Sequence, residues 1–437
     1  MGRLARKLGK GFCMHIKFAD CCVIGLGYIG LPTAAVLAAH GVRVYGIDVN
    51  SKVVDTINQG KIHIIEPDLD AIVHQTVRTG KLSAHKQPVA ADAYIIAVPT
   101  PFHEDKSPDL SYIRAATASI APVLRPGSLV VLESTSPVGT TEQLCKWLKE
   151  LRPDLSFPMD DNNPDVCIAY CPERVLPGKV LHELIYNDRA IGGMTVACSN
   201  KAEALYKTFL KGNCYTTNAR TAEMAKLTEN AFRDVNIAFA NELSLICSKN
   251  DINVWELIHL ANKHPRVNIL QPGPGVGGHC IAVDPWFIVA KNPDEARLIR
   301  TAREVNDAKP HRVVTQTLKV AKEFNLNKLA VLGLTYKPDI DDMRESPALD
   351  ICEELAAQFD GQIFVVEPHI VELPVQLKTK NCALHSVETA LAECDGLLIL
   401  VDHKVFRAAN RELFHNKVII DAKGVFQPGF HYQLLLL

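Results

Sequence analysis

The sequence has no excess of either charge and no long apolar run. Its 437 residues include 47 basic and 49 acidic side chains, giving a formal net charge of −2, so we expect no bulk attraction to nucleic acid or to a membrane surface. No apolar stretch approaches the roughly 18 residues of a membrane span. Hydrophobic residues make up 47% and charged residues 22%, which excludes a disordered chain. The length suggests about three domains.

Patterns typical of disulfide frameworks and metal sites are also missing. The 13 cysteines are odd in number, and several, such as Cys22 and Cys167, lie in apolar strand-like segments. Residues 1–17 are basic but lack the apolar core of a secretory signal, so we treat them as an N-terminal extension. We therefore expect reduced thiols in a cytoplasmic protein. Because no CxxC or HExxH pattern occurs, no metal site is predicted.

Strand-like and helical segments alternate in residues 18–213 and again in residues 311–437. Residues 214–310 differ, because Cys214 to His264 contains neither Gly nor Pro and has apolar residues at helical spacing. That spacing predicts one long helix, which typically bridges domains or forms a dimer interface, and a second helix from about Asn253. The fold class expected is α/β, with two doubly wound parallel-sheet domains joined by a central helical region. Strands are expected at 21–25, 42–47, 93–98, 128–132, 166–170, 328–333, 362–366, 396–401 and 417–421.

A glycine-rich turn follows the first expected strand. Gly25 permits a tight turn, Gly27 lets a pyrophosphate approach the backbone, and Gly30 lets the next helix pack on the strand. Asp48 ends the second strand, where its carboxylate can bind the ribose hydroxyls of NAD and would repel a 2′-phosphate. The motif therefore predicts NAD binding. The alternative is a packing turn with a strand-end Asp.

A second glycine-rich loop, Pro272–Cys280, delivers a single cysteine, and Asp284 follows four residues later. A thiol needs a cationic neighbour or a helix terminus to act as a nucleophile at neutral pH. On the long helix, Lys226, Asn230 and Arg233 share one face because they are spaced i, i+4 and i+7. They are expected to point into a polar cleft. The alternatives are an inert cysteine and a solvated helix face.

Further polar residues follow expected strands in both α/β domains. Thr135 and Glu173 do so in the first domain, and Tyr336, Lys337 and Arg344 do so in the second. Ligands of such sheets bind at the carboxyl ends of the strands, and Lys337 and Arg344 could neutralise phosphates. Turn chemistry and ordinary surface cations are the alternatives.

Taken together, these motifs resemble the UDP-glucose/GDP-mannose dehydrogenase family of nucleotide-sugar 6-dehydrogenases, from about Phe18 to Phe426. The likeness is clearest in Ala169–Gly178, Glu223–Asn230 and His264–Trp286. It implies two Rossmann-like domains, the first binding NAD and the second binding UDP. It also implies a homodimer or higher homo-oligomer whose product feeds surface polysaccharides such as the enterobacterial common antigen.

The resemblance implies a four-electron oxidation of a sugar C6 alcohol to a carboxylate, with two NAD reduced and one water consumed. The aldehyde would be captured by Cys280 as a thiohemiacetal, oxidised to a thioester and hydrolysed. The expected substrate is UDP-N-acetyl-D-mannosamine, and the alternative is UDP-N-acetylglucosamine, which differs at C2. Other readings are a two-electron hydroxyacid dehydrogenase, which has no role for the Cys280 loop, and a non-catalytic NAD-binding scaffold.

The resemblance also implies roles for individual residues, with His264 and Arg266 supplied by a neighbouring subunit. Catalytic roles fall to Cys280, Lys226, Asn230, Thr135, Glu173 and Asp284. NAD contacts fall to Gly25, Gly27, Tyr28, Ile29, Gly30, Asp48, Thr100, Thr135 and Arg344. Nucleotide-sugar contacts fall to Arg174, Val175, Lys226, Asn230, Arg233, His264, Arg266, Gly277, Tyr336, Lys337 and Lys423.

Overall fold

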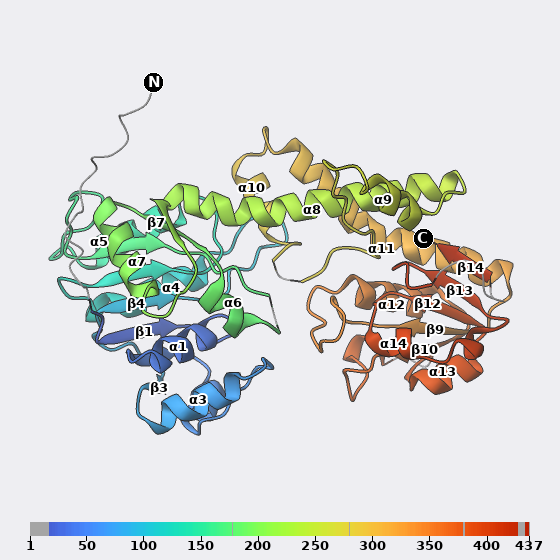
Figure 1. The fold of residues 1–437 in the computed structure, drawn as a ribbon, viewed down its shortest axis with the longest axis horizontal. Helices are drawn as coiled ribbons and strands as arrows, with labels where there is room; N and C mark the ends of the chain where they lie inside the picture. The colour runs from blue at the N-terminus through green and yellow to red at the C-terminus, as the bar shows by residue number, and fades with distance from the viewer. Residues whose placement is uncertain (1–16, 177, 279, 379–380, 427–432, 437) are drawn as a thin grey trace. The chain divides into compact units, whose positions relative to one another are not determined.

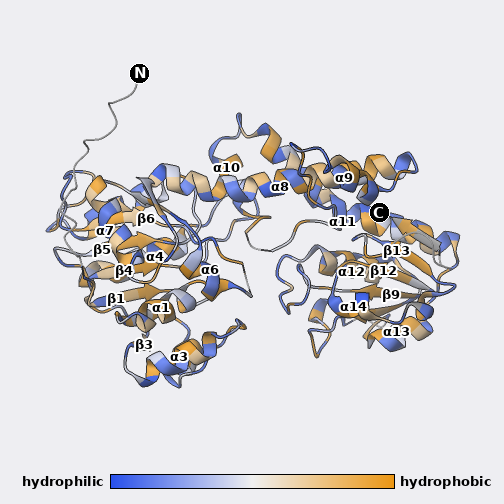
Figure 2. Ribbon diagram, in the orientation of Figure 1, coloured by the Kyte–Doolittle hydropathy of each residue, from blue (hydrophilic) through white to orange (hydrophobic). Residues whose placement is uncertain are grey.

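The computed structural model forms two compact units, Met1–Leu227 and Thr228–Leu437, which we describe separately. It describes every residue except 1–16, 177, 279, 379–380, 427–432 and 437. The predicted N-terminal extension therefore lies, apart from Lys17, outside the described residues. Figure 1 shows the helices and strands of each unit, and Figure 2 shows that the strands of both sheets are largely hydrophobic. None of the described helices combines the length and the hydropathy that a bilayer span requires.

The first unit is built on an eight-stranded sheet with strand order β3-β2-β1-β4-β5-β6-β7-β8. Neighbouring strands are parallel except for β6 and β7, which pair antiparallel. The bounds are β1 Asp20–Ile24, β2 Arg43–Ile47, β3 Leu82–His85, β4 Ala93–Ile96, β5 Leu129–Leu132, β6 Cys167–Tyr170, β7 Arg189–Gly193 and β8 Cys214–Asn218. The predicted doubly wound α/β fold is confirmed, with the antiparallel β7 as a departure from a purely parallel sheet.

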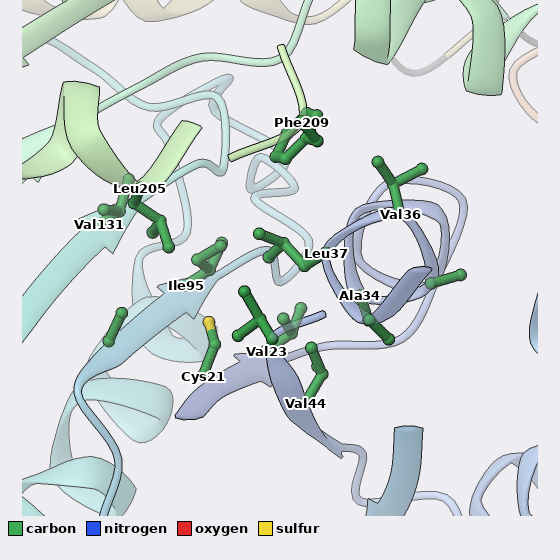
Figure 3. Close-up of a cluster of buried hydrophobic side chains, with 14 of the residues drawn as sticks. Cys21, Val23, Ala34, Val36, Leu37, Val44, Ile95, Val131, Leu205 and Phe209 are labelled. Carbon is green, nitrogen blue, oxygen red and sulfur yellow. The ribbon is translucent and has the colours of Figure 1, made fainter. Parts of the chain in front are cut away.

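Helices cover this sheet, and its core lies between sheet and helices. Figure 3 shows Val23 of β1, Ile95 of β4 and Leu37 of α1 packed within one buried apolar cluster. Such burial is the main favourable term in folding. The helices are α1 Gly30–Ala39, α2 Ser51–Asn58, α3 Leu69–Arg78, α4 Ser111–Ile120, α5 Thr140–Leu151, α6 Val180–Tyr186 and α7 Val196–Tyr206, with a short 3₁₀ turn at Ala121–Val123.

The second unit contains a six-stranded sheet in the order β11-β10-β9-β12-β13-β14. All of its strand pairs are parallel, and its order repeats that of β3-β2-β1-β4-β5-β6 in the first sheet. The strands are β9 Lys328–Leu332, β10 Gln362–Val366, β11 Cys382–Leu384, β12 Gly396–Ile399, β13 Val418–Asp421 and β14 Gln433–Leu436. The helices beside them are α12 Pro347–Gln358, α13 Val387–Glu393 and α14 Lys404–Ala408, with 3₁₀ turns at Val375–Leu377 and Arg411–Phe414.

The central region contains α8 (Ala219–Lys249), α9 (Val254–Ala261), α10 (Asp284–Lys291) and α11 (Arg297–Glu323). The predicted long helix and a second helix after Asn253 are both present. The segment from Cys214 to Asn218, which we expected to be helical, is instead strand β8, because its aromatic and β-branched residues pair with β7. Asn218 then caps α8 by accepting the N–H of Thr221 at 2.9 Å. The domain limits at 213 and 310 stay predictions, although α11 runs through Pro310.

A buried polar network joins α8 to α11 within the second unit. Arg303 pairs with Asp234 at 2.7 Å, and Asn306 donates to the same carboxylate at 2.8 Å. Asn241 donates to Asn306 at 2.9 Å and accepts the N–H of Gly273, also at 2.9 Å. The network therefore ends on the glycine-rich loop that leads to Cys280. Amides serve this purpose because each has both donors and an acceptor.

Lys309 of α11 is also buried, with 2% of its surface exposed, and donates to the Ser244 hydroxyl at 2.6 Å. Burial and the nearby Arg312 lower its pKa to about 8. The unfolded chain binds this proton below about pH 10.4, whereas the folded protein binds it only below about pH 8. Stability is therefore lost as the pH falls through this window, and the full cost, about 3 kcal/mol, is present below pH 8.

Lys309→Met should therefore raise the free energy of unfolding at pH 7 by about 2 kcal/mol, since it removes the buried amine but loses one hydrogen bond. The gain should shrink toward pH 10, where the wild-type lysine is neutral in the folded state. Urea unfolding at both pH values measures this, with the exposed Lys319→Met on the same helix as control. A variant less stable than wild type at pH 7 would contradict the assignment.

Candidate functional site

The turn after β1 has the geometry that its glycines predict. Gly25 has φ +90°, and a Cβ there would lie 2.5 Å from the Ala97 carbonyl oxygen. A Cβ at Gly30 would lie 1.8 Å from the Gly25 oxygen, so neither position accepts a side chain. A Cβ at Gly27, by contrast, would meet no atom of the described residues within 4 Å. The backbone at Gly27 is therefore open to a ligand group at the start of α1, where helix N–H groups favour a phosphate.

Asp48 follows β2 and is tied to this turn. Its Oδ2 accepts the N–H of Leu26 at 3.1 Å, and its Oδ1 accepts the N–H of Asn50 at 2.9 Å. An ionised carboxylate has about four acceptor positions, so Asp48 retains capacity for ribose hydroxyls. Thr100, after β4, has a buried Oγ1 with no partner among the described residues. An open glycine, a strand-end carboxylate and an orphaned hydroxyl fit a dinucleotide.

Glu173, after β6, is a predicted catalytic residue whose carboxyl is strongly perturbed. Its side chain is buried, and its Oε1 has no hydrogen-bond partner within the described part of the chain. Burial raises its pKa to about 8, although Lys226 and Arg189 act in the opposite direction. Lys226, on the first turns of α8, is also buried. The first unit thus contains a buried carboxyl with a pKa of about 8, and the charge of a buried lysine lowers that pKa. Such an arrangement is typical of residues that transfer protons.

Glu223 fixes the start of α8 in the same unit. Its carboxylate accepts the N–H of Gly139 at 2.6 Å and both the N–H and the hydroxyl of Thr141, at 2.8 and 2.7 Å. Thr141 lies in the first turn of α5, where a carboxylate is favoured. Thr135, half-buried, lies in the segment between β5 and this helix. Lys226 follows Glu223 by three residues, so this anchor also fixes the helical turn that carries the lysine.

In the second unit, Cys280 is exposed and precedes the first turn of α10. Its carbonyl oxygen accepts the N–H groups of Val283 and Asp284 at 3.1 and 2.9 Å. Asp284 is buried, and its Oδ2 accepts the Asn230 amide at 2.5 Å. Two predicted catalytic residues, Asn230 and Asp284, are therefore in direct contact, and Asp284 follows the cysteine by one helical turn. Arg233 lies on the exposed surface of α8.

The loop that carries Cys280 packs on the turn after β9. A Cβ at Gly277 would lie 2.4 Å from the Glu345 oxygen and 2.9 Å from the Tyr336 side chain, so only glycine fits. Gly278 donates to the same Glu345 oxygen at 3.2 Å. At Gly273, a Cβ would lie 3.2 Å from the Lys423 amine. The unit therefore gathers the predicted nucleotide-sugar residues Gly277, Tyr336 and Lys423.

The other predicted residues are divided between the two units. Lys337 is half-buried beside Tyr336, and burial lowers the pKa of Lys423 against the opposing Asp402 and Asp421. Arg344 is exposed and forms a two-point pair with Asp342 at 2.9 and 2.6 Å. It belongs to the second unit, whereas the other predicted NAD residues belong to the first. Tyr28, Ile29, Arg174 and Val175 are half-buried in the first unit, and His264 and Arg266 are exposed after α9.

Glu367 was not singled out by the sequence motifs. In the second unit its carboxylate occupies the position equivalent to that of Asp48, since each accepts a backbone N–H of the turn after the neighbouring strand. Its Oε2 accepts the N–H of Leu334 at 2.7 Å and that of Thr335 at 3.2 Å. Burial opposes ionisation, but the His403 hydrogen bond and the Leu334 N–H outweigh it and hold the pKa of Glu367 below its ordinary value. The sequence contained a signal for this residue, because Glu367 directly follows an apolar strand, as Asp48 does.

Asp339, His369 and His403 bring possible metal-ligand atoms within 4.8 Å of one another. The Nδ1 of His403 accepts the Asp339 N–H at 3.0 Å, which places its proton on Nε2, 3.1 Å from Glu367. Both ring nitrogens are thus engaged in holding the turn that contains Tyr336. We assign His403 to this hydrogen-bonded structure rather than to a metal.

Comparisons with known proteins identify the family of this chain. Residues 19–210, 220–308 and 330–428 match, in turn, the NAD binding, central and UDP binding domains of the UDP-glucose/GDP-mannose dehydrogenase family. The chain is 59% identical to UDP-N-acetyl-D-mannosamine dehydrogenase of Escherichia coli (strain K12), over 94% of this chain and 100% of that protein.

Two further relatives are informative. The NDP-N-acetyl-D-galactosaminuronic acid dehydrogenase of Ralstonia nicotianae is 58% identical over 94% of this chain and 97% of its own length. The solved structure of a UDP-D-ManNAc dehydrogenase from Pyrococcus horikoshii has a TM-score of 0.86 and 38% identity, covering 95% of this chain and 98% of that one. Since all three domains match in order and together span most of its length, this chain belongs to the UDP-glucose/GDP-mannose dehydrogenase family.

Proposed function

We propose that this protein oxidises C6 of UDP-N-acetyl-D-mannosamine to the carboxylate, with two NAD reduced for each sugar. The 59% identity to an enzyme named for that substrate, over the full length of that enzyme, carries the proposal. The exposed Cys280 at the end of a tightly packed glycine loop supports the four-electron reaction. A two-electron dehydrogenase has no use for such a thiol.

NAD is the cofactor we propose for the first unit. The open backbone at Gly27, the orphaned Thr100 hydroxyl and the strand-end Asp48 fit its pyrophosphate and ribose groups. When bound, NAD accepts a hydride from the sugar C6 carbon in each of the two oxidations. The Asp48 carboxylate would also repel the additional phosphate of NADP.

Cys280 is the group we propose for covalent capture of the aldehyde. Its sulfur forms a bond to the aldehyde carbon, and the carbonyl oxygen takes up a proton to become the hydroxyl of a thiohemiacetal. Loss of the C6 hydride to a second NAD, together with loss of the hydroxyl proton, would leave a thioester. The N-terminal turn of α10 follows the cysteine, where helix N–H groups favour negative charge. Lys226 and Asn230, one turn apart on α8, would stabilise the alkoxide oxygen, and Asp284 would orient the Asn230 amide.

Hydrolysis of the thioester needs a group that removes a proton from water. Glu173 suits this role because its buried carboxyl has a pKa of about 8 and an Oε1 that finds no hydrogen-bond partner among the described residues. The proton leaves water for the carboxylate, the hydroxide oxygen bonds to the acyl carbon, and the Cys280 sulfur departs as thiolate. Thr135 is the second residue that we assign to this water.

The nucleotide-sugar is proposed to bind the second unit. Tyr336 supplies an aromatic face, and Lys337 and Lys423, whose amine lies beside the glycine-rich loop, are the cations we propose for the diphosphate. Arg174 and Val175 of the first unit are further residues to which the family likeness assigns nucleotide-sugar contacts. The carboxylate of Glu367 holds the turn from which Tyr336 and Lys337 extend.

A second copy of this chain is the partner we propose for the groove between α8 and α11 of the second unit. This groove has a volume of about 480 Å³ and is lined mainly by apolar side chains, including Phe232, Phe239 and Leu298. Phe232 is 69% exposed and Phe239 is 51% exposed, a cost that association would remove. Arg266 also lines the groove, as suits a residue expected to reach a neighbouring subunit.

Adjacent buried thiols bear on the compartment. Cys167 and Cys198 of the first unit are both buried, and each thiol affects the pKa of the other. Neighbouring thiols persist in a reducing compartment. We propose the cytoplasm as the compartment of this protein.

With limiting UDP-N-acetyl-D-mannosamine, the wild-type protein should release two NADH per sugar. Cys280→Ala should lower acid formation on the order of a thousandfold or more, because no thioester can form. Absorbance at 340 nm and mass spectrometry of the sugar measure both quantities. The matched control is Cys214→Ala, a half-buried cysteine outside the proposed site.

One NADH per sugar in the wild type, or unchanged acid formation in Cys280→Ala, would contradict covalent capture. UDP-N-acetylglucosamine and UDP-N-acetylgalactosamine are assayed in parallel, because the Ralstonia relative is nearly as similar as the Escherichia coli enzyme. Preference for either would keep the mechanism and change the substrate.

Asp48→Asn should shift the cofactor preference toward NADP by roughly tenfold or more, because it removes the charge that opposes the 2′-phosphate. The asparagine keeps an oxygen that can accept the Leu26 N–H. The ratio of kcat/KM for the two cofactors measures the effect, with the exposed Asp55→Asn of α2 as control. Equal use of both cofactors by the wild type would remove the role given to Asp48.

Phe239→Glu should convert the oligomer to a species near the chain mass of 48.1 kDa, since a charge in the groove opposes burial. Light scattering after gel filtration measures the mass. Val375→Glu, at a position 80% exposed outside the groove, is the control. An unchanged mass for Phe239→Glu would show that this groove is not the interface.

A further inference from the structure

A buried ion pair lies beneath the loops of the first unit. Glu133 is 2% exposed and Arg189 is 4% exposed, and Oε1 of the glutamate lies 3.3 Å from Nη1 of the arginine. Tyr206 donates to the same carboxylate at 3.3 Å and Thr33 at 3.4 Å. The guanidinium also lies over the Tyr206 ring, 4.5 Å from its centroid. The pair is thus held from several sides.

The contacts of this pair connect three elements that lead to proposed site residues. Thr33 belongs to α1, three residues after Gly30 of the glycine-rich turn. Glu133 follows β5 and precedes Thr135 by two residues. Arg189 begins β7 and donates to the Cys171 sulfur at 3.7 Å, two residues before Glu173. The ion pair therefore connects the helix of the proposed NAD site to the loop that carries Thr135 and to the loop that carries Glu173.

Stability alone is a weak reason for such a pair. Desolvating two charges costs several kcal/mol per ion, and well-packed apolar residues of similar volume often replace a buried pair without loss. Hydrogen bonds reaching into three separate elements are, by contrast, something that apolar residues cannot supply. The contacts point to a role in placing the loops.

We infer that Glu133 and Arg189 are positioning residues for the oxidation, which hold the Thr135 and Glu173 loops against α1 and set the electrostatic environment of Glu173. The inference rests on the function proposed for Glu173. It assigns no contact with substrate or cofactor to either residue. It states that the opposite charges of Glu133 and Arg189 act on the buried carboxyl of Glu173.

Glu133 and Arg189 have opposite effects on the pKa of Glu173. Burial is the largest cause of its raised pKa; Lys226 of α8 and Arg189 of β7 lower the pKa, whereas Glu133 and Glu183 of α6 raise it. Neutralising Glu133 alone should therefore favour the ionised form of Glu173, and neutralising Arg189 alone should favour the protonated form. A purely structural pair predicts no such reversal of sign.

The test is a titration of Glu173 in the free protein by carboxyl-carbon NMR after glutamate labelling, with the resonance assigned by its loss in Glu173→Gln. Glu133→Gln should lower the midpoint, and Arg189→Gln should raise it, each by about half a unit or more. The double variant Glu133→Gln/Arg189→Gln should return close to wild type. Glu150→Gln, an exposed residue of α5, is the matched control. This readout is independent of turnover.

The pH dependence of kcat then links the charge to the reaction. Its acidic limb should move down in pH for Glu133→Gln and up for Arg189→Gln, with kcat affected more than the KM for the sugar. If Arg189→Gln fails to fold because Glu133 is left uncompensated, Glu133→Gln still decides the question. Unmoved midpoints in a folded Glu133→Gln protein would overturn the inference.

An acidic limb that persists unchanged in Glu173→Gln would instead count against the proposed role of Glu173, whatever the NMR midpoints show. Absence of NADH release by the wild type would count against the proposed activity. The two failures are therefore distinguishable from failure of the positioning role.

Discussion

In each unit, a carboxylate at the end of one strand accepts the backbone N–H of the turn that follows the neighbouring strand. Asp48 accepts from Leu26 at 3.1 Å, and Glu367 accepts from Leu334 at 2.7 Å. The preceding glycines, Gly25 and Gly333, have φ of +90° and +93°. Each also donates to the residue before the carboxylate, at 2.8 Å in both cases. Both proposed nucleotide sites depend on turns fixed in this way.

The two turns are repeats that have taken different roles. Gly27 leaves its backbone open, whereas the equivalent Thr335 is buried and donates to the Lys337 oxygen at 2.9 Å. Asp48 keeps acceptor capacity, whereas Glu367 is occupied by backbone N–H groups and by His403. The second turn is therefore closed to a pyrophosphate at the position where the first is open. It presents side chains, Tyr336 and Lys337, in place of bare backbone.

Local patterns made much of this predictable. The glycine turn, Asp48 and the Cys280 loop are short motifs whose spacing suggested a chemistry, and the Gly- and Pro-free stretch predicted α8. The similarity of the turns after β1 and β9 is also visible in the sequence, since Val23-Ile-Gly-Leu-Gly-Tyr28 is matched by Val331-Leu-Gly-Leu-Thr-Tyr336. The antiparallel β7 and the strand at 214–218 were not predicted, because pairing depends on a distant partner rather than on the segment itself.

The groups that hold the motifs were harder to predict for the same reason. Glu223 bonds to Gly139 across 84 residues, and Arg189 bonds to Glu133 across 56, so no local spacing marks either pair. In addition, the sequence does not distinguish a buried charged residue from an exposed one.

Several buried polar groups in the described part of this protein hold loops, and this follows from what apolar side chains cannot do. An apolar side chain contributes burial but cannot fix a backbone N–H, whereas Asn241 fixes Gly273 and Glu223 fixes Gly139. The pair of Asp234 and Arg303 supports the first of these contacts through Asn306. A covalent mechanism with two oxidations needs its loops in one arrangement through several chemical states. The desolvation cost of such groups is therefore best understood as the cost of keeping that arrangement.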